Sequence, residues 1–235
     1  MKTNLRTKIA ASILIMGLAA GVNAQVVLVP GASVFNTGGA LQTTLGAFSL
    51  LDSKSSAFVS SDPTAFSGVL DSWVLSGDTN NPLHGLDFVY RLTNSTTSND
   101  AIHRMTVNGF GNFLVDAGYL NSGATPTGGV VAGGLTPTLV DRGLAPGDNA
   151  GFGFLQSLVS GIAFDSLDPG MTSRYLVLYT NATSYGNSMA SVIDGSVASA
   201  ATFAPVPEPE TYALMLAGLG LMGFVGRRRS KKNVV

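Results

Sequence analysis

Signals for tight turns recur at short intervals along residues 25–204, and they leave little room for long regular elements. Each signal brings together Asp, Asn, Ser, Gly or Pro, residue types that favour the backbone angles of turns. No amphipathic helical periodicity is evident between them. The intervening segments have the length of strands and predict an all-β fold. The turn signals are Ser61-Asp62-Pro63, Gly77-Asp78, Asn108-Gly109, Pro146-Gly147, Asp168-Pro169-Gly170 and Asp194-Gly195.

Two segments indicate which faces of the strands are buried. Residues 87–92 place Phe88, Tyr90 and Leu92 on one face and Asp87 and Arg91 on the other, the period of a half-buried strand. Residues 174–180 are apolar on both faces, which predicts a central strand covered on both sides. Roughly ten short strands favour one antiparallel β-sandwich or jelly-roll-like domain over residues 25–204. The other strands are expected at residues 41–51, 66–75, 103–107, 113–120, 138–141, 151–155, 161–164 and 189–193.

Residues 1–24 predict a signal peptide. Lys2, Arg6 and Lys8 form a basic start, and residues 9–22 form an apolar run. The run ends at a small-residue cleavage site with Ala24 as its last residue. Cleavage between Ala24 and Gln25 would make Gln25 the mature N-terminus.

The composition changes abruptly after Ala204. Residues 205–211 form a polar linker that contains Val206, Pro207, Glu208, Pro209 and Glu210. The apolar run at residues 212–226 would form a helix of about 22 Å, against a hydrocarbon core of about 30 Å, and flanking residues would have to extend it into a transmembrane helix. The basic residues of 227–235, among them Arg227, Arg228 and Arg229, resist crossing the membrane by roughly 3 kcal/mol each. We therefore expect a cytoplasmic C-terminal tail and an anchor in the inner membrane.

The order of a Pro-Glu-Pro motif, an apolar helix, an arginine cluster and the chain end closely resembles the PEP-CTERM sorting signal of exported Gram-negative proteins. The resemblance covers residues 205–232. It implies processing by a membrane enzyme called an exosortase, with removal of the tail near Pro207-Glu208-Pro209. It further implies release or attachment at the cell surface or in an extracellular matrix, usually where exopolysaccharide is made. The same tail is also labelled the C-terminal domain of ice-binding proteins, a name that implies no activity of this chain.

Charge and cysteine content exclude several classes of function. The chain has no cysteine, which removes disulfide scaffolds, cysteine-based metal sites and cysteine nucleophiles. Residues 25–204 carry five Lys and Arg against twelve Asp, a net charge of −7, which argues against nucleic acid as a partner. The pattern G-x-G-x-x-G at residues 218–223 lies in the apolar tail, without the strand that a dinucleotide site needs. We expect no cofactor.

No constellation of residues predicts catalysis, and we assign no catalytic residue. The histidines are His84 and His103, and the serine nearest to a nucleophile motif, Ser188, lacks the final glycine and the following helix. Asp165 and Asp168 lie close enough in sequence to suggest a carboxylate pair or a weak calcium site. Asp168-Pro169-Gly170 is also typical of a plain turn, the interpretation we favour.

Five aromatic residues would be able to stack on sugar rings. On strands such rings more often belong to the core, and Tyr185, in a polar segment, is the one expected to be most exposed. The leading hypothesis is a non-enzymatic, exosortase-sorted surface or matrix protein associated with exopolysaccharide. The alternatives are a carbohydrate-binding module and, less favoured, an unrecognised hydrolase. The five aromatic residues are Trp73, Tyr119, Tyr175, Tyr179 and Tyr185.

Overall fold

Two sheets stacked face to face make up most of the computed structural model, which describes residues 27–144, 148–154, 166–207 and 214–222. In spatial order, sheet A contains β2 (Gln42–Thr43), β7 (Val115–Leu120), β10 (Leu176–Thr180), β5 (Asp87–Asn94), β4 (Ser67–Ser76) and β3 (Ser49–Val59). Sheet B contains β1 (Ser33–Phe35), β8 (Leu139–Arg142), β9 (Asn149–Gly153), β6 (Arg104–Asn108), β11 (Tyr185–Asp194) and β12 (Ser196–Pro205). Neighbouring strands are antiparallel except β2 and β7, so the predicted antiparallel sandwich is confirmed for this part of the chain.

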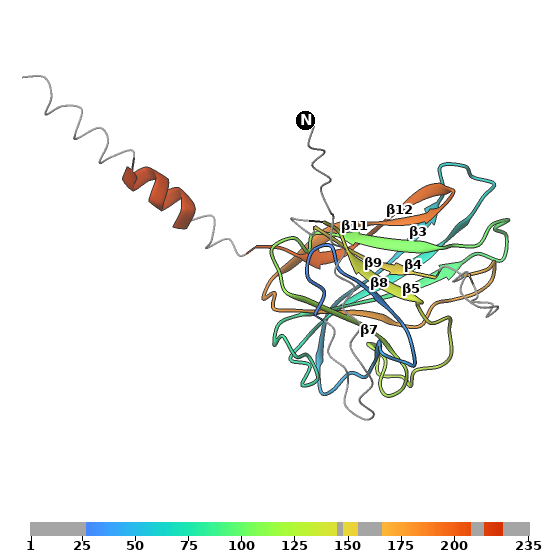
Figure 1. Cartoon of the computed structure of the whole chain (residues 1–235), viewed down its shortest axis with the longest axis horizontal. Coiled ribbons are helices and arrows are strands. Elements are labelled where there is room, and N and C mark those ends of the chain that lie inside the picture. Colours follow the sequence, from blue (N-terminus) through green and yellow to red (C-terminus); the bar gives the residue numbers. More distant parts are fainter. Residues whose placement is uncertain (1–26, 145–147, 155–165, 208–213, 223–235) are drawn as a thin grey trace, which may run out of the picture.

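The inner faces of the two sheets form the main core. Alternate residues of each strand point inward, and the buried side chains include Phe88, Tyr90, Met105 and Phe152. Phe88 meets Phe110 edge to face, with ring centroids 5.7 Å apart. The long hairpins β3–β4 and β11–β12 lie against each other, so that β12 of sheet B packs on β3 and β4 of sheet A (Figure 1).

The outer face of sheet A is covered as well. A second apolar cluster there combines Val89 of β5 and Val177 of β10 with Leu45 from the segment before β3. Val131, from the glycine-rich segment after β7, packs on the same cluster. Both faces of β10 are therefore buried, and the predicted central strand is confirmed.

Most predicted strands coincide with observed ones, and the exceptions have physical causes. The strand expected at residues 41–51 was wrong: β2 is two residues long, and β3 begins only at Ser49. The sequence interpretation missed β1, which has only 3 residues, and β12, which consists largely of small residues. The strand expected at residues 161–164 lies outside the described residues.

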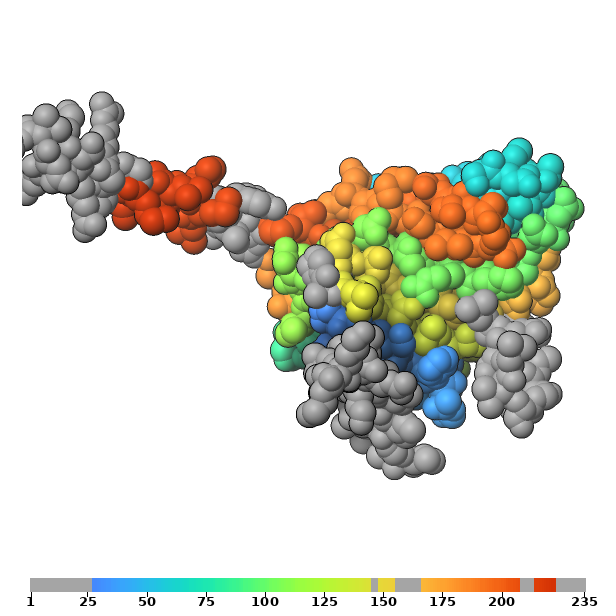
Figure 2. Space-filling view, turned by 45° about the horizontal axis from the view of Figure 1, so that its top comes forward, coloured from blue at the N-terminus to red at the C-terminus, as the bar shows by residue number. Residues whose placement is uncertain are grey.

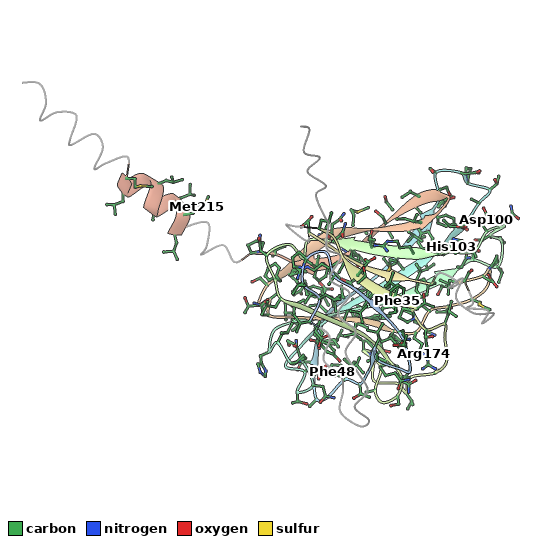
Figure 3. All side chains as sticks on the ribbon, in the orientation of Figure 1. Phe35, Phe48, Asp100, His103, Arg174 and Met215 are labelled. Carbon is green, nitrogen blue, oxygen red and sulfur yellow. The ribbon has the colours of Figure 1, made fainter. Side chains whose placement is uncertain are left out.

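The last strand leads directly into the C-terminal tail. β12 ends at Pro205, and the backbone N–H of Val206 still donates to the carbonyl of Ser184 at 3.1 Å. Residues 214–222 form a helix that carries Met215 and stands apart from the sandwich (Figures 1 and 3). Among the described residues, no helix combines the length and apolar character needed to cross a membrane.

Candidate functional site

The tail places the start of the sorting motif at the edge of the sandwich. Val206 and Pro207 are half-buried. Val206 packs closely on Gly186, because a Cβ atom at position 186 would lie only 3.0 Å from Val206 Cγ1. Figure 2 shows the surface of β11 and β12, in orange, next to the point where the chain leaves the sandwich. Several predicted residues lie outside the described ranges: Ala24, Gln25, Glu208, Pro209, Glu210, Arg227, Arg228 and Arg229.

A shallow open cavity of about 150 Å³ lies on the outer face of sheet A, over β3 and β4. In the antiparallel register Trp73 stands opposite Ser53, and Asp71 opposite Ser55, so the four side chains share one face. We call these four residues the Trp73 site. The cavity is lined by Ser53, Lys54, Ser55, Asp71 and Trp73.

The indole of Trp73 is half-buried and held from behind. Its ring centroid lies 5.5 Å from that of Tyr175, at an interplanar angle of 51°. Tyr175 in turn carries the guanidinium of Arg91 at 4.8 Å from its ring centroid, and Arg91 Nη1 donates to the Tyr175 hydroxyl at 3.3 Å. The stack from Arg91 through Tyr175 fixes the indole while leaving part of it exposed to the cavity.

The polar groups around the indole are not used inside the molecule. Among the described residues, the hydroxyls of Ser53 and Ser55, the carboxylate of Asp71 and Nε1 of Trp73 have no hydrogen-bond partner. The outer face of sheet B differs, because Arg104 there forms a bidentate pair with Asp141. The Trp73 site therefore combines an aromatic surface with hydrogen-bonding groups directed to solvent.

Farther along the outer face of sheet A, two carboxyl groups are buried together. Asn81 Nδ2 donates to Asp87 Oδ1 at 2.6 Å, and Asp78 Oδ1 accepts from the backbone N–H groups of Gly46 and Asn80. Burial raises the pKa of Asp87 to about 9, and the charge and hydrogen bond of Asp78 add to the effect. At neutral pH Asp87 is therefore protonated, and its carboxyl group donates a hydrogen bond to Asp78 while keeping the proton.

The burial of Asp87 contradicts the sequence expectation of a polar, solvent-facing position on a half-buried strand. The segment between β4 and β5 folds back over this end of the strand, with the N–H of Gly85 donating to the Thr180 carbonyl at 3.0 Å. Asp87 thereby becomes fully buried. Alternation within β5 gave no indication of this tertiary cover.

The residues considered for hydrolysis have structural partners in the described part of the chain. Ser188 lies within β11, where its Oγ donates to the carbonyl of Asn108 at 2.9 Å. His103 pairs with Asp194, which ends β11, whereas Ser188 lies toward the other end of that strand. His84 is exposed, with a positive φ of 60° in the segment before β5. These positions do not bring Ser188 and either histidine into a catalytic arrangement.

Of the two residues of the weak calcium candidate, Asp165 and Asp168, the structure describes only Asp168. Asp168 is exposed, and its carbonyl accepts from the N–H of Met171 at 2.9 Å, the hydrogen bond of a tight turn. Gly170 has a φ of +84°, which suits the third position of a type II turn. Asp165 lies outside the described residues, and the described part contains no group of three or more His, Asp or Glu side chains placed to hold a metal ion.

The aromatic residues considered for sugar binding have different roles. Tyr119 and Tyr179 are each 3% exposed and belong to the core. Tyr185 is the most exposed of the four tyrosines, as expected, but it is partly buried and packs edge to face on Phe203 at 5.8 Å. Trp73 is the aromatic residue that lines the cavity. The sequence feature that could have revealed this position is the alternation along β4, where Asp71 and Trp73 lie between residues that are buried.

Comparison with known proteins identifies the C-terminal segment. Residues 205–229 match the family model described as the PEP-CTERM protein-sorting motif. No curated protein and no solved structure matches the chain. The motif begins at Pro205, which is also the last residue of β12, so the sorting segment follows the sandwich without an intervening domain. The chain is a protein with a C-terminal PEP-CTERM sorting domain.

Proposed function

We propose that this chain is an exported surface or matrix protein whose non-enzymatic β-sandwich associates with exopolysaccharide after an exosortase has removed the tail. The observation that carries the proposal is the PEP-CTERM motif at residues 205–229, which supports export and sorting by an exosortase. The position of this motif, directly after a folded sandwich, indicates that the sandwich is the part delivered.

The order of events follows from the ends of the chain. Residues 1–24 direct export as a signal peptide and are removed before Gln25. The apolar run at residues 212–226 then stops in the inner membrane, because the arginines at 227–229 resist crossing. The anchor is transient and holds the motif at the outer surface of that membrane until the exosortase acts.

The geometry of β12 fits removal of the tail after folding. Among the described residues, Val206 makes the last backbone hydrogen bond that joins this end of the chain to the sandwich. A cut near Pro207 and Glu208 therefore leaves the β11–β12 pairing intact. A chain from Val206 to Tyr212 would span at most about 20 Å if fully extended, so the sandwich would stay close to the membrane until it is released.

A non-enzymatic role is supported by the partners of the candidate catalytic groups. In the described part of the chain, Ser188 is bonded to a backbone carbonyl and His103 to Asp194. A carbohydrate-binding module is the second candidate function, and one specific feature favours it: the Trp73 site presents an aromatic surface and unused polar groups on one face.

Cell fractionation tests the proposal. The full chain is expressed in a host that has an exosortase and in the same host without it, and the protein is followed in the inner-membrane, surface and extracellular-polysaccharide fractions. We expect the chain in the surface or polysaccharide fraction only when the enzyme is present. Recovery from the inner membrane in both hosts would contradict the proposal.

A further inference from the structure

We propose that the Trp73 site binds one pyranose ring within a neutral polysaccharide. The inference rests on the proposed function, since it names the residues and the class of sugar through which the sandwich would associate with a matrix. It depends on three features of the site: the half-buried indole that lines the cavity, the unused polar groups and the open shape of the cavity.

The indole supplies the apolar part of the binding surface. One side of a pyranose ring presents mainly C–H groups, and an aromatic ring fixed in place covers them at little cost in conformational entropy. Trp73 meets this requirement, because Tyr175 and Arg91 support it from behind. Its Nε1 has no partner among the described residues and is available as a donor.

The polar groups complement the hydroxyls of a sugar. A sugar hydroxyl both donates and accepts, so a site for it needs both kinds of group. The Asp71 carboxylate accepts hydrogen bonds, and the hydroxyls of Ser53 and Ser55 do both. Cross-strand pairing places these groups beside the indole on regular strands, which holds the constellation in position.

The shape of the cavity favours an internal unit of a long chain. The cavity, at about 150 Å³, is smaller than the roughly 300–1,000 Å³ of typical ligand pockets, which suits a single sugar ring. The cavity is open to solvent, so the polysaccharide would be able to continue in both directions along the sheet. A closed pocket would instead select a free monosaccharide or a chain end.

Charge favours a neutral sugar over an acidic one. Asp71 stands at the site without a cationic partner in the described part of the chain, and it would repel the carboxylate of a uronic acid. Arg91 is the nearest cationic side chain by register, opposite Asp71, but its guanidinium is stacked on Tyr175. The net charge of −7 over residues 25–204 likewise repels acidic polysaccharides.

Intrinsic fluorescence gives a direct test, because Trp73 is the single tryptophan of the chain. The full chain is purified in a detergent without a sugar headgroup and titrated with hydroxyethyl cellulose, laminarin and dextran, with alginate as the acidic comparison. We expect a saturable change in emission with at least one neutral glucan and protection of the indole from acrylamide quenching. Alginate should produce neither effect.

Variants assign the binding to the site. In affinity electrophoresis, Trp73→Ala and Asp71→Ala should each weaken binding, the first by about tenfold or more. Asp71→Ala removes a side chain with no partner among the described residues, so it should fold normally even if Trp73→Ala does not. Phe35→Ala is the matched control, because Phe35 is an aromatic residue 64% exposed on β1 of the other sheet, and it should bind like the original chain.

The outcomes separate this inference from the proposed function. Absence of any fluorescence change with all three neutral glucans would overturn the inference, as would binding unchanged by Asp71→Ala. Loss of binding in Phe35→Ala to the same extent would also overturn it, since that result indicates nonspecific adhesion. Sorting to the surface in the fractionation experiment would leave the proposed function standing in each of these cases.

Discussion

The hydroxyl of Tyr90 donates a hydrogen bond to the carbonyl of Phe203 at 2.9 Å, across the core between the two sheets. Tyr90 belongs to β5 of sheet A and is fully buried. Phe203 belongs to β12 of sheet B, close to the end of that strand at Pro205. The bond therefore fastens the strand that leads into the sorting segment to the opposite sheet.

Replacing Tyr90 by Phe should lower the free energy of unfolding by about 1 kcal/mol. The ring and its packing remain, while the Phe203 carbonyl loses its buried donor. Urea denaturation measures the change. Tyr185→Phe is the control, because its hydroxyl lies 3.4 Å from Asp52 Oδ2 at the rim of the core, and its loss should cost less. Equal stability of Tyr90→Phe and the original chain would contradict this role.

Asp87→Asn should change how stability depends on pH. The pKa of Asp87 is raised to about 9 in the folded protein, from an ordinary value of 3.8. Between these values the folded state holds a proton that the unfolded state has released, so this group favours unfolding increasingly as the pH rises. The slope is at most about 1.4 kcal/mol per pH unit, and it ends above the folded pKa.

An asparagine at position 87 keeps both hydrogen bonds, because its oxygen accepts from Asn81 and its amide donates to Asp78. We expect the variant to match the original chain near pH 3.5, below the ordinary pKa of the carboxyl group, and to exceed it in stability by an increasing margin up to pH 8. Thermal unfolding at a series of pH values measures the difference. A variant that is less stable than the original chain at pH 8 would show that Asp87 is not protonated there.

Gly151→Ala should disrupt the ion pair between Arg104 and Asp141. The pair has distances of 2.5 and 2.7 Å and crosses over β9, where a methyl group at position 151 would lie 2.6 Å from Asp141 Oδ1 and 2.8 Å from Arg104 Nη2. We expect a loss of about 1 kcal/mol in the free energy of unfolding. In an Asp141→Ala background the same change should cost much less. Equal costs in both backgrounds would rule out the proposed steric coupling.

The sequence predicted the class of fold well and the details of the outer face poorly. Alternation and turn residues locate strands such as β5 and β10, because those signals are local. The burial of Asp87 depends on a loop that folds over it, and alternation along the strand does not reveal such a loop. The Trp73 site needs the serines of β3 beside the indole, and the sequence interpretation largely missed β3. The sorting motif was predictable because it is a linear pattern and requires no fold.

The triple variant Pro207→Ala, Glu208→Ala, Pro209→Ala should retain the tail in a host that has the exosortase. The sandwich should remain equally stable, since β12 ends before these residues. Immunoblotting with a tag inserted after Val235 detects retention. Lys231→Ala with Lys232→Ala is the control, because both residues lie beyond the matched segment and their replacement should not prevent processing. Normal processing of the triple variant would contradict the assignment of the motif.

The most direct test of the account is the intact mass of the protein from hosts with and without an exosortase. The account predicts a product that begins at Gln25 and ends near Pro207 only when the enzyme is present. A chain that retains residues 212–235 in both hosts would contradict it, and the protein would then be a permanently anchored one.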